Sequence, residues 1–190
     1  MEGRLVSLEL DPSRPVTGDT LRAVVNVEGA NVDEKAVHIR WNVNGKDLET
    51  TGIVLEHRLR YGDSVTATAE LISFDGRPQV LSTSVLVGNA PPTIGLLQET
   101  VNGGEYVAVI QMEDPEQDEV VLKLVEAPEG MVLDEAAKTL RWRPSSDQIG
   151  GTFQVVLEGK DSLSNVCRFD FDVTVTGSGK NELFAGSERQ

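Results

Sequence analysis

The sequence is poor in the residues that build metal centres and disulfide frameworks. It has one cysteine, Cys167, and two histidines in 190 residues. A single cysteine excludes an intramolecular disulfide and a cysteine-rich zinc site, and two histidines leave little for a histidine-based metal site. The sequence also lacks any run of 18 apolar residues, so no segment is predicted to span a membrane.

Basic residues are scarce as well. The chain has 17 lysines and arginines against 31 acidic residues, a formal charge of −14. This balance disfavours the phosphate contacts that dominate nucleic-acid binding, and it disfavours anionic membrane surfaces. We therefore expect that the chain neither binds nucleic acid nor inserts into a membrane. The acidity is uneven, with 9 basic and 13 acidic residues (−4) in 1–89, but 8 basic and 18 acidic residues (−10) in 90–190.

Hydrophobic residues recur at every second position over most of the chain, as in 37–43 and 65–71. Successive side chains of a strand point to opposite faces, so each such segment is predicted to be a strand with one buried face. No stretch with a helical period is longer than two turns, so the predicted fold class is all-β. The predicted strands are 5–10, 21–27, 37–43, 53–59, 64–72, 80–87, 93–97, 106–112, 120–125, 139–143, 153–161 and 166–175.

Turn residues divide these strands into two groups. Asn44-Gly45 predicts a tight hairpin, because both positions of such a turn require positive φ. Gly88-Asn-Ala-Pro-Pro92 predicts a domain boundary, since proline cannot donate to a strand ladder and forces the preceding residue into an extended conformation. We therefore expect one β-sandwich over 1–89, a second over 90–176, and a flexible glycine- and serine-containing C-terminal tail over 177–190.

The second half carries a series of landmarks in a fixed order. They are Asp114-Pro-Glu-Gln-Asp118, Ala127-Pro-Glu-Gly-Met131, Leu140-Arg-Trp-Arg-Pro144 and Gly150-Gly-Thr-Phe153. This order resembles the cadherin-like, dystroglycan-type Ig module that occurs as tandem repeats in bacterial surface and secreted proteins. That family's pattern has an Asp-Pro-Asp-Gly-Asp turn, a Pro-x-Gly-Met/Leu corner, a Trp-x-Pro strand end and a Gly-x-Tyr/Phe strand start.

The first half is similar to bacterial Ig-like repeats at Trp41-Asn-Val-Asn-Gly45 and Tyr61-Gly-Asp-Ser-Val65. Together the resemblances imply two tandem Ig-like and cadherin-like β-sandwich domains. Modules of these families are spacers, adhesion modules and ligand-presenting modules, not enzymes. The resemblance therefore implies a non-catalytic structural, adhesive or spacer module, without catalytic residues, whose partner is another protein or like modules of the same assembly.

The sequence gives less direct evidence about the cellular location of the protein. The first ten residues are acidic and alternating, unlike the basic end and apolar core of a secretion signal. A cytoplasmic protein and a mature fragment with a new start methionine both fit these residues. The resemblance favours an extracytoplasmic location, in the periplasm, on the cell surface or secreted.

The resemblance also implies ligands for calcium, the one cofactor considered. In that family the acidic turn contributes to calcium sites near a domain junction, together with an aspartate late in the module. The matching positions here are Asp114, Glu116, Asp118 and Asp161, with an oxygen of Asn89 in the linker. Two residues depart from the family pattern, since Glu116 replaces an aspartate and Gln117 a glycine. The alternative interpretation is a solvated acidic turn that limits pairing at a sheet edge.

Two other classes of function stay open at this level. A carbohydrate-binding accessory module of a larger enzyme or surface protein needs exposed aromatic side chains, for which Tyr61, Phe74 and Phe184 are the candidates. A hydrolase needs a nucleophile with a base or a suitably spaced pair of carboxylates. Neither His38 nor His57 lies in a nucleophile motif, so we expect no enzymatic activity.

Overall fold

The computed structural model describes residues 3–29, 37–72 and 76–176, and the backbone of 184–188. These residues form antiparallel β-sheets and no helix, which confirms the all-β class and is consistent with β-sandwich architecture. The described part of the chain accordingly holds no apolar helix that could cross a membrane. The strands are β1 (Arg4–Asp11), β2 (Arg22–Glu28), β3 (Val37–Val43), β4 (Lys46–Thr51), β5 (Ser64–Ile72), β6 (Pro78–Leu86), β7 (Thr93–Asn102), β8 (Glu105–Glu113), β9 (Val121–Glu126), β10 (Val132–Asp134), β11 (Thr139–Trp142), β12 (Thr152–Lys160), β13 (Val166–Val175) and β14 (Phe184–Glu188).

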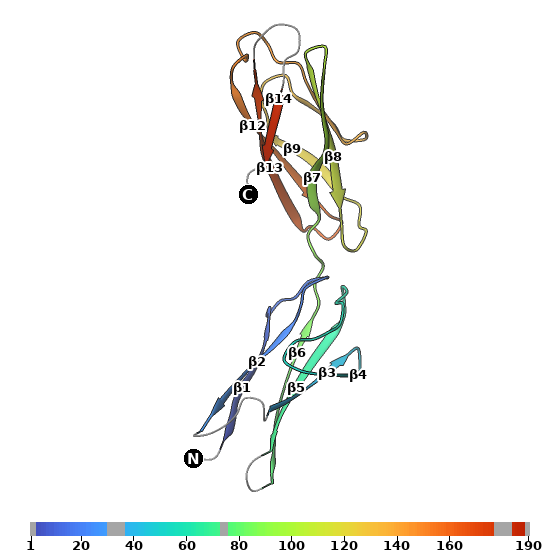
Figure 1. Cartoon of the computed structure of the whole chain (residues 1–190). Coiled ribbons are helices and arrows are strands. Elements are labelled where there is room, and N and C mark those ends of the chain that lie inside the picture. The colour runs from blue at the N-terminus through green and yellow to red at the C-terminus, as the bar shows by residue number, and fades with distance from the viewer. Residues whose placement is uncertain (1–2, 30–36, 73–75, 177–183, 189–190) are drawn as a thin grey trace. The chain divides into compact units, whose positions relative to one another are not determined.

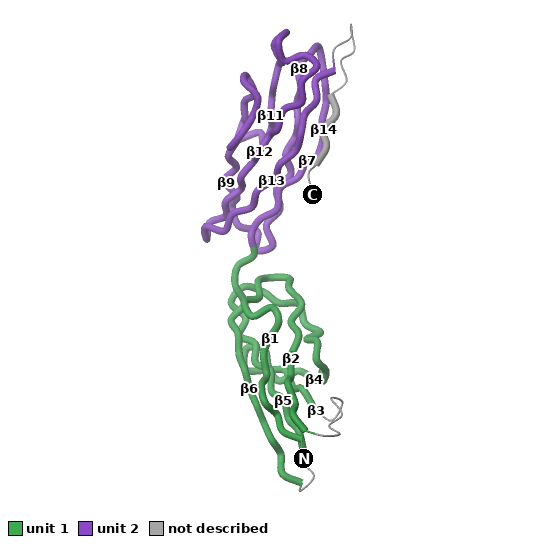
Figure 2. Tube along the Cα trace, turned by 90° about the vertical axis from the view of Figure 1, so that its left-hand side faces the viewer, with its two compact units in different colours: residues 1–90 green, residues 91–190 purple. Residues whose placement is uncertain are grey.

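The chain divides into two compact units, unit 1 (Met1–Ala90) and unit 2 (Pro91–Gln190), which Figure 2 colours separately. The division falls between Ala90 and Pro91, inside the proline-containing segment 88–92. Each unit has its own cluster of buried hydrophobic side chains.

Unit 1 has a four-stranded sheet in the order β4-β3-β5-β6 and a two-stranded sheet, β1-β2 (Figure 1). Odd-numbered side chains of β3 and β5 point into the core, as the period of two predicts; Ile39, Trp41 and Val65 are buried. Trp41 Nε1 donates a hydrogen bond to the Gly52 carbonyl at 2.8 Å, so its polar atom is satisfied next to the core.

The Asn44-Gly45 hairpin is confirmed. It joins β3 to β4, and the two residues have φ values of 53° and 81°. Asn44 Oδ1 accepts a hydrogen bond from the backbone N–H of Ser64 at 2.9 Å, and Asn44 Nδ2 donates one to Asp63 Oδ1 at 2.8 Å. The hairpin is therefore tied to the start of β5.

The strand predicted over Ile53–Leu59 is wrong. Only its first residues pair with another strand, through the Ala23 N–H to the Ile53 carbonyl at 2.7 Å and the Leu55 N–H to the Leu21 carbonyl at 2.9 Å. A continuous strand would place His57 on the same side as the buried Leu55 and Leu59. Residues 56–58 are all exposed instead, because polar side chains keep this stretch in water.

Unit 2 has two four-stranded sheets, in the orders β10-β11-β8-β7 and β14-β13-β12-β9 (Figure 1). The core between the two sheets contains Tyr106, Trp142 and Phe171, each at most 1% exposed. Trp142 packs edge to face against Phe153, with ring centroids 5.2 Å apart, and its Nε1 donates to the Glu129 carbonyl at 3.1 Å. Both tryptophans of the chain are thus buried, one in the core of each unit.

The C-terminal segment differs from the expected flexible tail over five residues. Phe184–Glu188 forms β14 and pairs antiparallel with Phe171–Val175 of β13. The expectation came from the glycines and serines of this segment, of which Gly186 and Ser187 lie within β14, whereas residues 177–179 lie outside the described residues. Sequence composition could not reveal this pairing, because the free edge of β13 exists only after unit 2 has folded.

Candidate functional site

The acidic loop between β8 and β9 is organised by Asp114. Its Oδ1 accepts hydrogen bonds from the backbone N–H groups of Glu116 at 2.9 Å and Asp118 at 3.0 Å. The Gln117 N–H donates to the Asp114 carbonyl at 3.1 Å, and Gln117 has a φ of 67°. The loop therefore needs a left-handed residue at the position where the family that the sequence resembles carries glycine.

The loop between β12 and β13 is organised by Asp161, which is only 5% exposed. Its Oδ1 accepts hydrogen bonds from the backbone N–H groups of Leu163 at 2.9 Å and Asn165 at 2.8 Å, and its Oδ2 accepts one from Asn165 Nδ2 at 2.9 Å. These three bonds explain how a carboxylate is tolerated in a buried position.

The two loops bring three aspartates together. One carboxylate oxygen from each of Asp114, Asp118 and Asp161 lies within 4.8 Å of the other two. In addition, Asp114 Oδ2 is buried and has no hydrogen-bond partner. The structure thus unites three of the five residues that were predicted to bind calcium.

The geometry of this aspartate cluster (Asp114, Asp118 and Asp161) suits a calcium ion. Calcium takes six to eight oxygen ligands at 2.3–2.6 Å, so two oxygens bound to one ion lie at most about 5 Å apart. Two like charges 4 Å apart repel by about 1 kcal/mol in water and about 4 kcal/mol near a protein surface. A cation at the centre would offset that repulsion and supply a partner for Asp114 Oδ2.

The other two predicted ligands are placed differently. Glu116 lies in the same loop and is half-buried, but its carboxylate is not part of the aspartate cluster. Asn89 belongs to unit 1, and its Nδ2 donates to the Ala90 carbonyl at 3.1 Å. Participation of Asn89 therefore stays a prediction.

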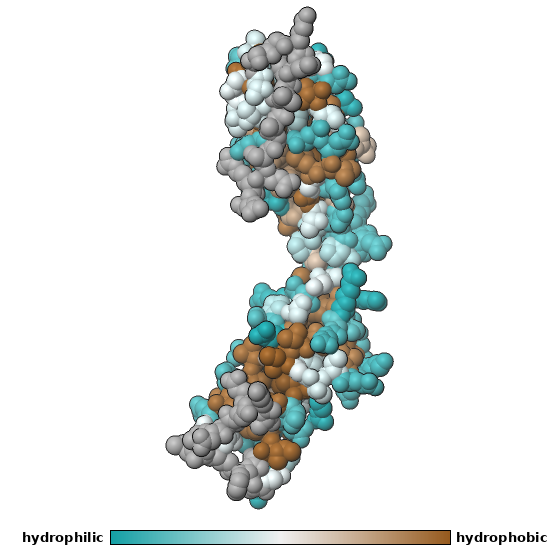
Figure 3. All heavy atoms as spheres, viewed as in Figure 1, coloured by the Kyte–Doolittle hydropathy of each residue, from teal (hydrophilic) through white to brown (hydrophobic). Residues whose placement is uncertain are grey.

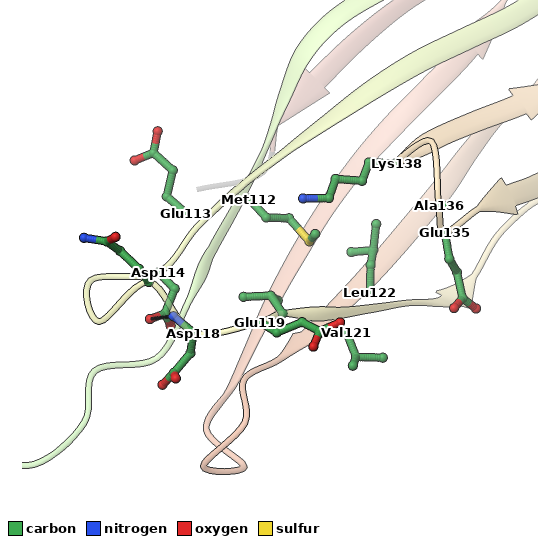
Figure 4. A pocket seen from close by; sticks show the side chains of 12 residues that line it. Met112, Glu113, Asp114, Asp118, Glu119, Val121, Leu122, Glu135, Ala136 and Lys138 are labelled. Atoms are coloured by element: carbon green, nitrogen blue, oxygen red, sulfur yellow. Dashed lines mark hydrogen bonds between the residues drawn. The ribbon is translucent and has the colours of Figure 1, made fainter.

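An open groove of about 810 Å³ runs along unit 2 beside the acidic loop. Figure 4 shows Asp114 and Asp118 at one end of the groove, and Glu135 and Lys138, from the turn between β10 and β11, at the other. The Lys138 side chain extends toward Met112 in this view. The groove lining thus combines carboxylates, one ammonium group and apolar side chains.

Sequence reasoning missed Glu135 and Lys138 as part of this groove. Both residues lie in the turn between β10 and β11. The turn reaches the groove because β11 pairs with β8, with Thr139 opposite Val109. No local pattern signals such a pairing between strands 30 residues apart in sequence.

The remaining candidate side chains do not converge. His38 and His57 are both exposed in unit 1. Of the aromatic residues considered for sugar binding, Tyr61 is 55% exposed, whereas Phe74 and the side chain of Phe184 lie outside the described residues. Cys167 is half-buried on β13, and its burial raises the pKa of the thiol.

Comparison of the chain with models of known protein families gives no match, and a search of curated proteins finds no similar sequence. The chemistry of the site therefore has to be argued from its geometry alone.

Proposed function

We propose that the chain is a non-catalytic structural or adhesive module, built from two tandem Ig-like and cadherin-like β-sandwiches, that acts through protein–protein contacts in an extracytoplasmic assembly. Two separate cores make each unit a self-contained body. Antiparallel sandwiches of this kind keep sheet edges to which an extended segment of a partner can add.

The observation that carries the proposal is the character of edge strand β6. It is nine residues long, has no charged side chain, and pairs with β5 without a bulge. On its outward face Val80 and Leu86 are 51% and 70% exposed. Edge strands in monomeric proteins are commonly protected by charges, prolines, bulges, short length or a covering segment. β6 begins with Pro78, and the Gln79 side chain bonds to the backbone of Gly3 and Leu5. Residues 80–86 are uncharged, regular and partly apolar, which indicates a contact surface.

Lysine substitutions on β6 test this proposal. Val80→Lys with Leu86→Lys places charge on the exposed face without touching the core. We expect the unaltered chain to co-purify with a stoichiometric protein partner from its native source and the β6 variant to lose it. The matched control is His38→Lys, on the outward face of the non-edge strand β3, and it should keep the partner. Equal recovery by the β6 variant and the control would contradict the proposal.

We also propose that the aspartate cluster binds calcium and thereby clamps two loops of unit 2 to each other. The support is the convergence of three carboxylates within 4.8 Å and the buried, unpartnered Asp114 Oδ2. A bound ion would restrain the loop after β8 against the loop after β12.

Thermal unfolding with calcium and with a chelator tests the calcium proposal. Calcium at 100 times its Kd should stabilise unit 2 by about 2.7 kcal/mol. Asp118→Asn should abolish the shift, and it leaves the loop hydrogen bonds in place, because Asp118 supports the loop through its backbone N–H. Glu126→Gln, at the exposed end of β9, is the control and should keep the shift. Identical midpoints of the unaltered chain with calcium and chelator would sink the idea.

A further inference from the structure

Strand β14 is held to unit 2 along one side and over a short length. Its five residues pair with Phe171–Val175, whereas β13 pairs with β12 over nine positions, from Val166 to Thr174 (Figure 1). β14 is the last strand in the sheet order β14-β13-β12-β9. Its backbone pairing can therefore be removed while β13 stays anchored to β12.

The part of β13 that β14 covers lies over the core of unit 2. Phe171, Val173 and Val175 all lie within it, and each is 0% exposed. Without its neighbouring strand, β13 would present an open sheet edge beside three core side chains, and such an edge is a template for pairing with an extended segment. The segment that matches this edge in register is residues 184–188.

The connection between the two strands permits that segment to come from another molecule. Eight residues, 176–183, join Val175 to Phe184. Fully extended, they span at most about 26–29 Å. Such a tether holds β14 near its own β13 at an effective concentration on the order of millimolar. In dilute solution β13 should therefore pair with β14 of its own chain. When copies are held close together, β14 of another copy should compete for the same pairing.

We propose that β14 is an exchangeable strand whose partner is a second copy of this chain: β14 of one copy pairs with Phe171–Val175 of the other. The exchanged pairing reproduces the contacts already present within one chain, which makes exchange a low-cost route to association. The inference rests on the proposed protein-contact function and adds a second contact to it, through an edge different from β6.

Cross-linking between differently labelled chains tests the exchange. Thr174 of β13 lies opposite Ala185 of β14 in the register. One chain carries Thr174→Cys and the other Ala185→Cys, both with Cys167→Ser, and they are mixed near millimolar concentration and oxidised. We expect a covalent dimer of the two chains. A mixture of Thr152→Cys and Ala185→Cys is the control and should stay monomeric, because Thr152 lies on β12, one strand farther away.

The decisive comparison is with both cysteines in one chain. If Thr174→Cys and Ala185→Cys in one chain form an internal disulfide while the mixed chains never cross-link, β14 pairs only within its own molecule and the exchange is refuted. That outcome leaves the β6 contact intact, so failure of the exchange and failure of the proposed function are distinguishable.

Shortening the connection gives a second, independent test. Deleting residues 176–183 joins Val175 directly to Phe184, and a hairpin cannot close without turn residues. Exchange predicts a dimer of twice the chain mass at micromolar concentration, measured by light scattering, with each β14 on the other copy's β13. A chain that ends at residue 175 is the control and should be monomeric. A monomeric deletion variant would overturn the proposal.

Discussion

Asp114 and Asp161 organise two different loops of unit 2 in the same way. Each uses Oδ1 to accept hydrogen bonds from the backbone N–H groups two and four residues later. In each loop the third following residue, Gln117 or Ser164, has a positive φ, of 67° or 75°. The two loops are therefore copies of one local motif, and each presents its carboxylate to the other.

The left-handed residues of these loops offer a route to a more stable protein. A non-glycine residue in this conformation destabilises the fold by roughly 1–2 kcal/mol. Glycine avoids this strain, but it costs about 0.5–1 kcal/mol because it loses more conformational entropy on folding. Gln117→Gly and Ser164→Gly should each raise the free energy of unfolding by about 0.5–1 kcal/mol. Urea unfolding followed by circular dichroism measures the change. Ser162→Gly, in the same loop but without positive φ, should be neutral or destabilising.

Gly159 permits close packing in unit 2. A Cβ at this position would lie 2.9 Å from Ile94 Cδ1, 3.1 Å from Cys167 Sγ and 3.2 Å from Val120 Cγ1. Gly159→Ala should therefore destabilise unit 2 by about 1–3 kcal/mol through overpacking. Gly95→Ala on β7 is the matched control, because its Cβ would meet no atom within 4 Å. A variant as stable as this control in urea would show that the neighbours move aside.

The hydroxyl of Tyr106 should make unit 2 sensitive to alkali. Burial raises the pKa of Tyr106 well above its ordinary range, and the hydrogen bond that the hydroxyl donates to Glu99 Oε1 at 2.5 Å adds to the effect. The unfolded chain loses this proton near pH 10, whereas the folded chain keeps it. Stability is therefore fully present below about pH 10 and falls as the pH rises toward the folded pKa.

Unfolding in urea between pH 8 and pH 11 measures this dependence. The unaltered chain should lose stability more steeply above pH 10 than Tyr106→Phe, which has no proton to lose at this position. Parallel curves for the two proteins would show that Tyr106 does not control the alkaline transition.

Cys167 should react slowly in the folded protein. Burial raises the pKa of its thiol, and the nearby charge of Asp161 acts in the same direction. Because the thiolate is the reactive form, alkylation by iodoacetamide at pH 8 should be slower in the native protein than in concentrated urea. Asp161→Asn should accelerate the native reaction. Equal rates in the native and unfolded states would contradict the burial.

The sequence predicted all three residues of the aspartate cluster, but it could not show which other predicted residue lies outside it. Asp114 and Asp118 are close in any turn that joins them. Asp161 meets them because the loops after β8 and after β12 lie at the same end of unit 2, which only the family resemblance suggested. The same reasoning included Glu116, whose carboxylate does not join the cluster. The sequence could not exclude it, because a loop residue has no periodicity that predicts the direction of its side chain.

The sequence by itself determined the local structure of this protein. A period of two specified most strands and their buried faces, and Asn44-Gly45 specified a hairpin through its tolerance of positive φ. Tertiary structure alone decided which strand edges pair with another segment. Residues 53–59 leave the ladder after its first contacts, and residues 184–188 join one. The physical reason is that the direction of a side chain follows from its neighbours in sequence, whereas an open edge is made by strands that are distant in sequence.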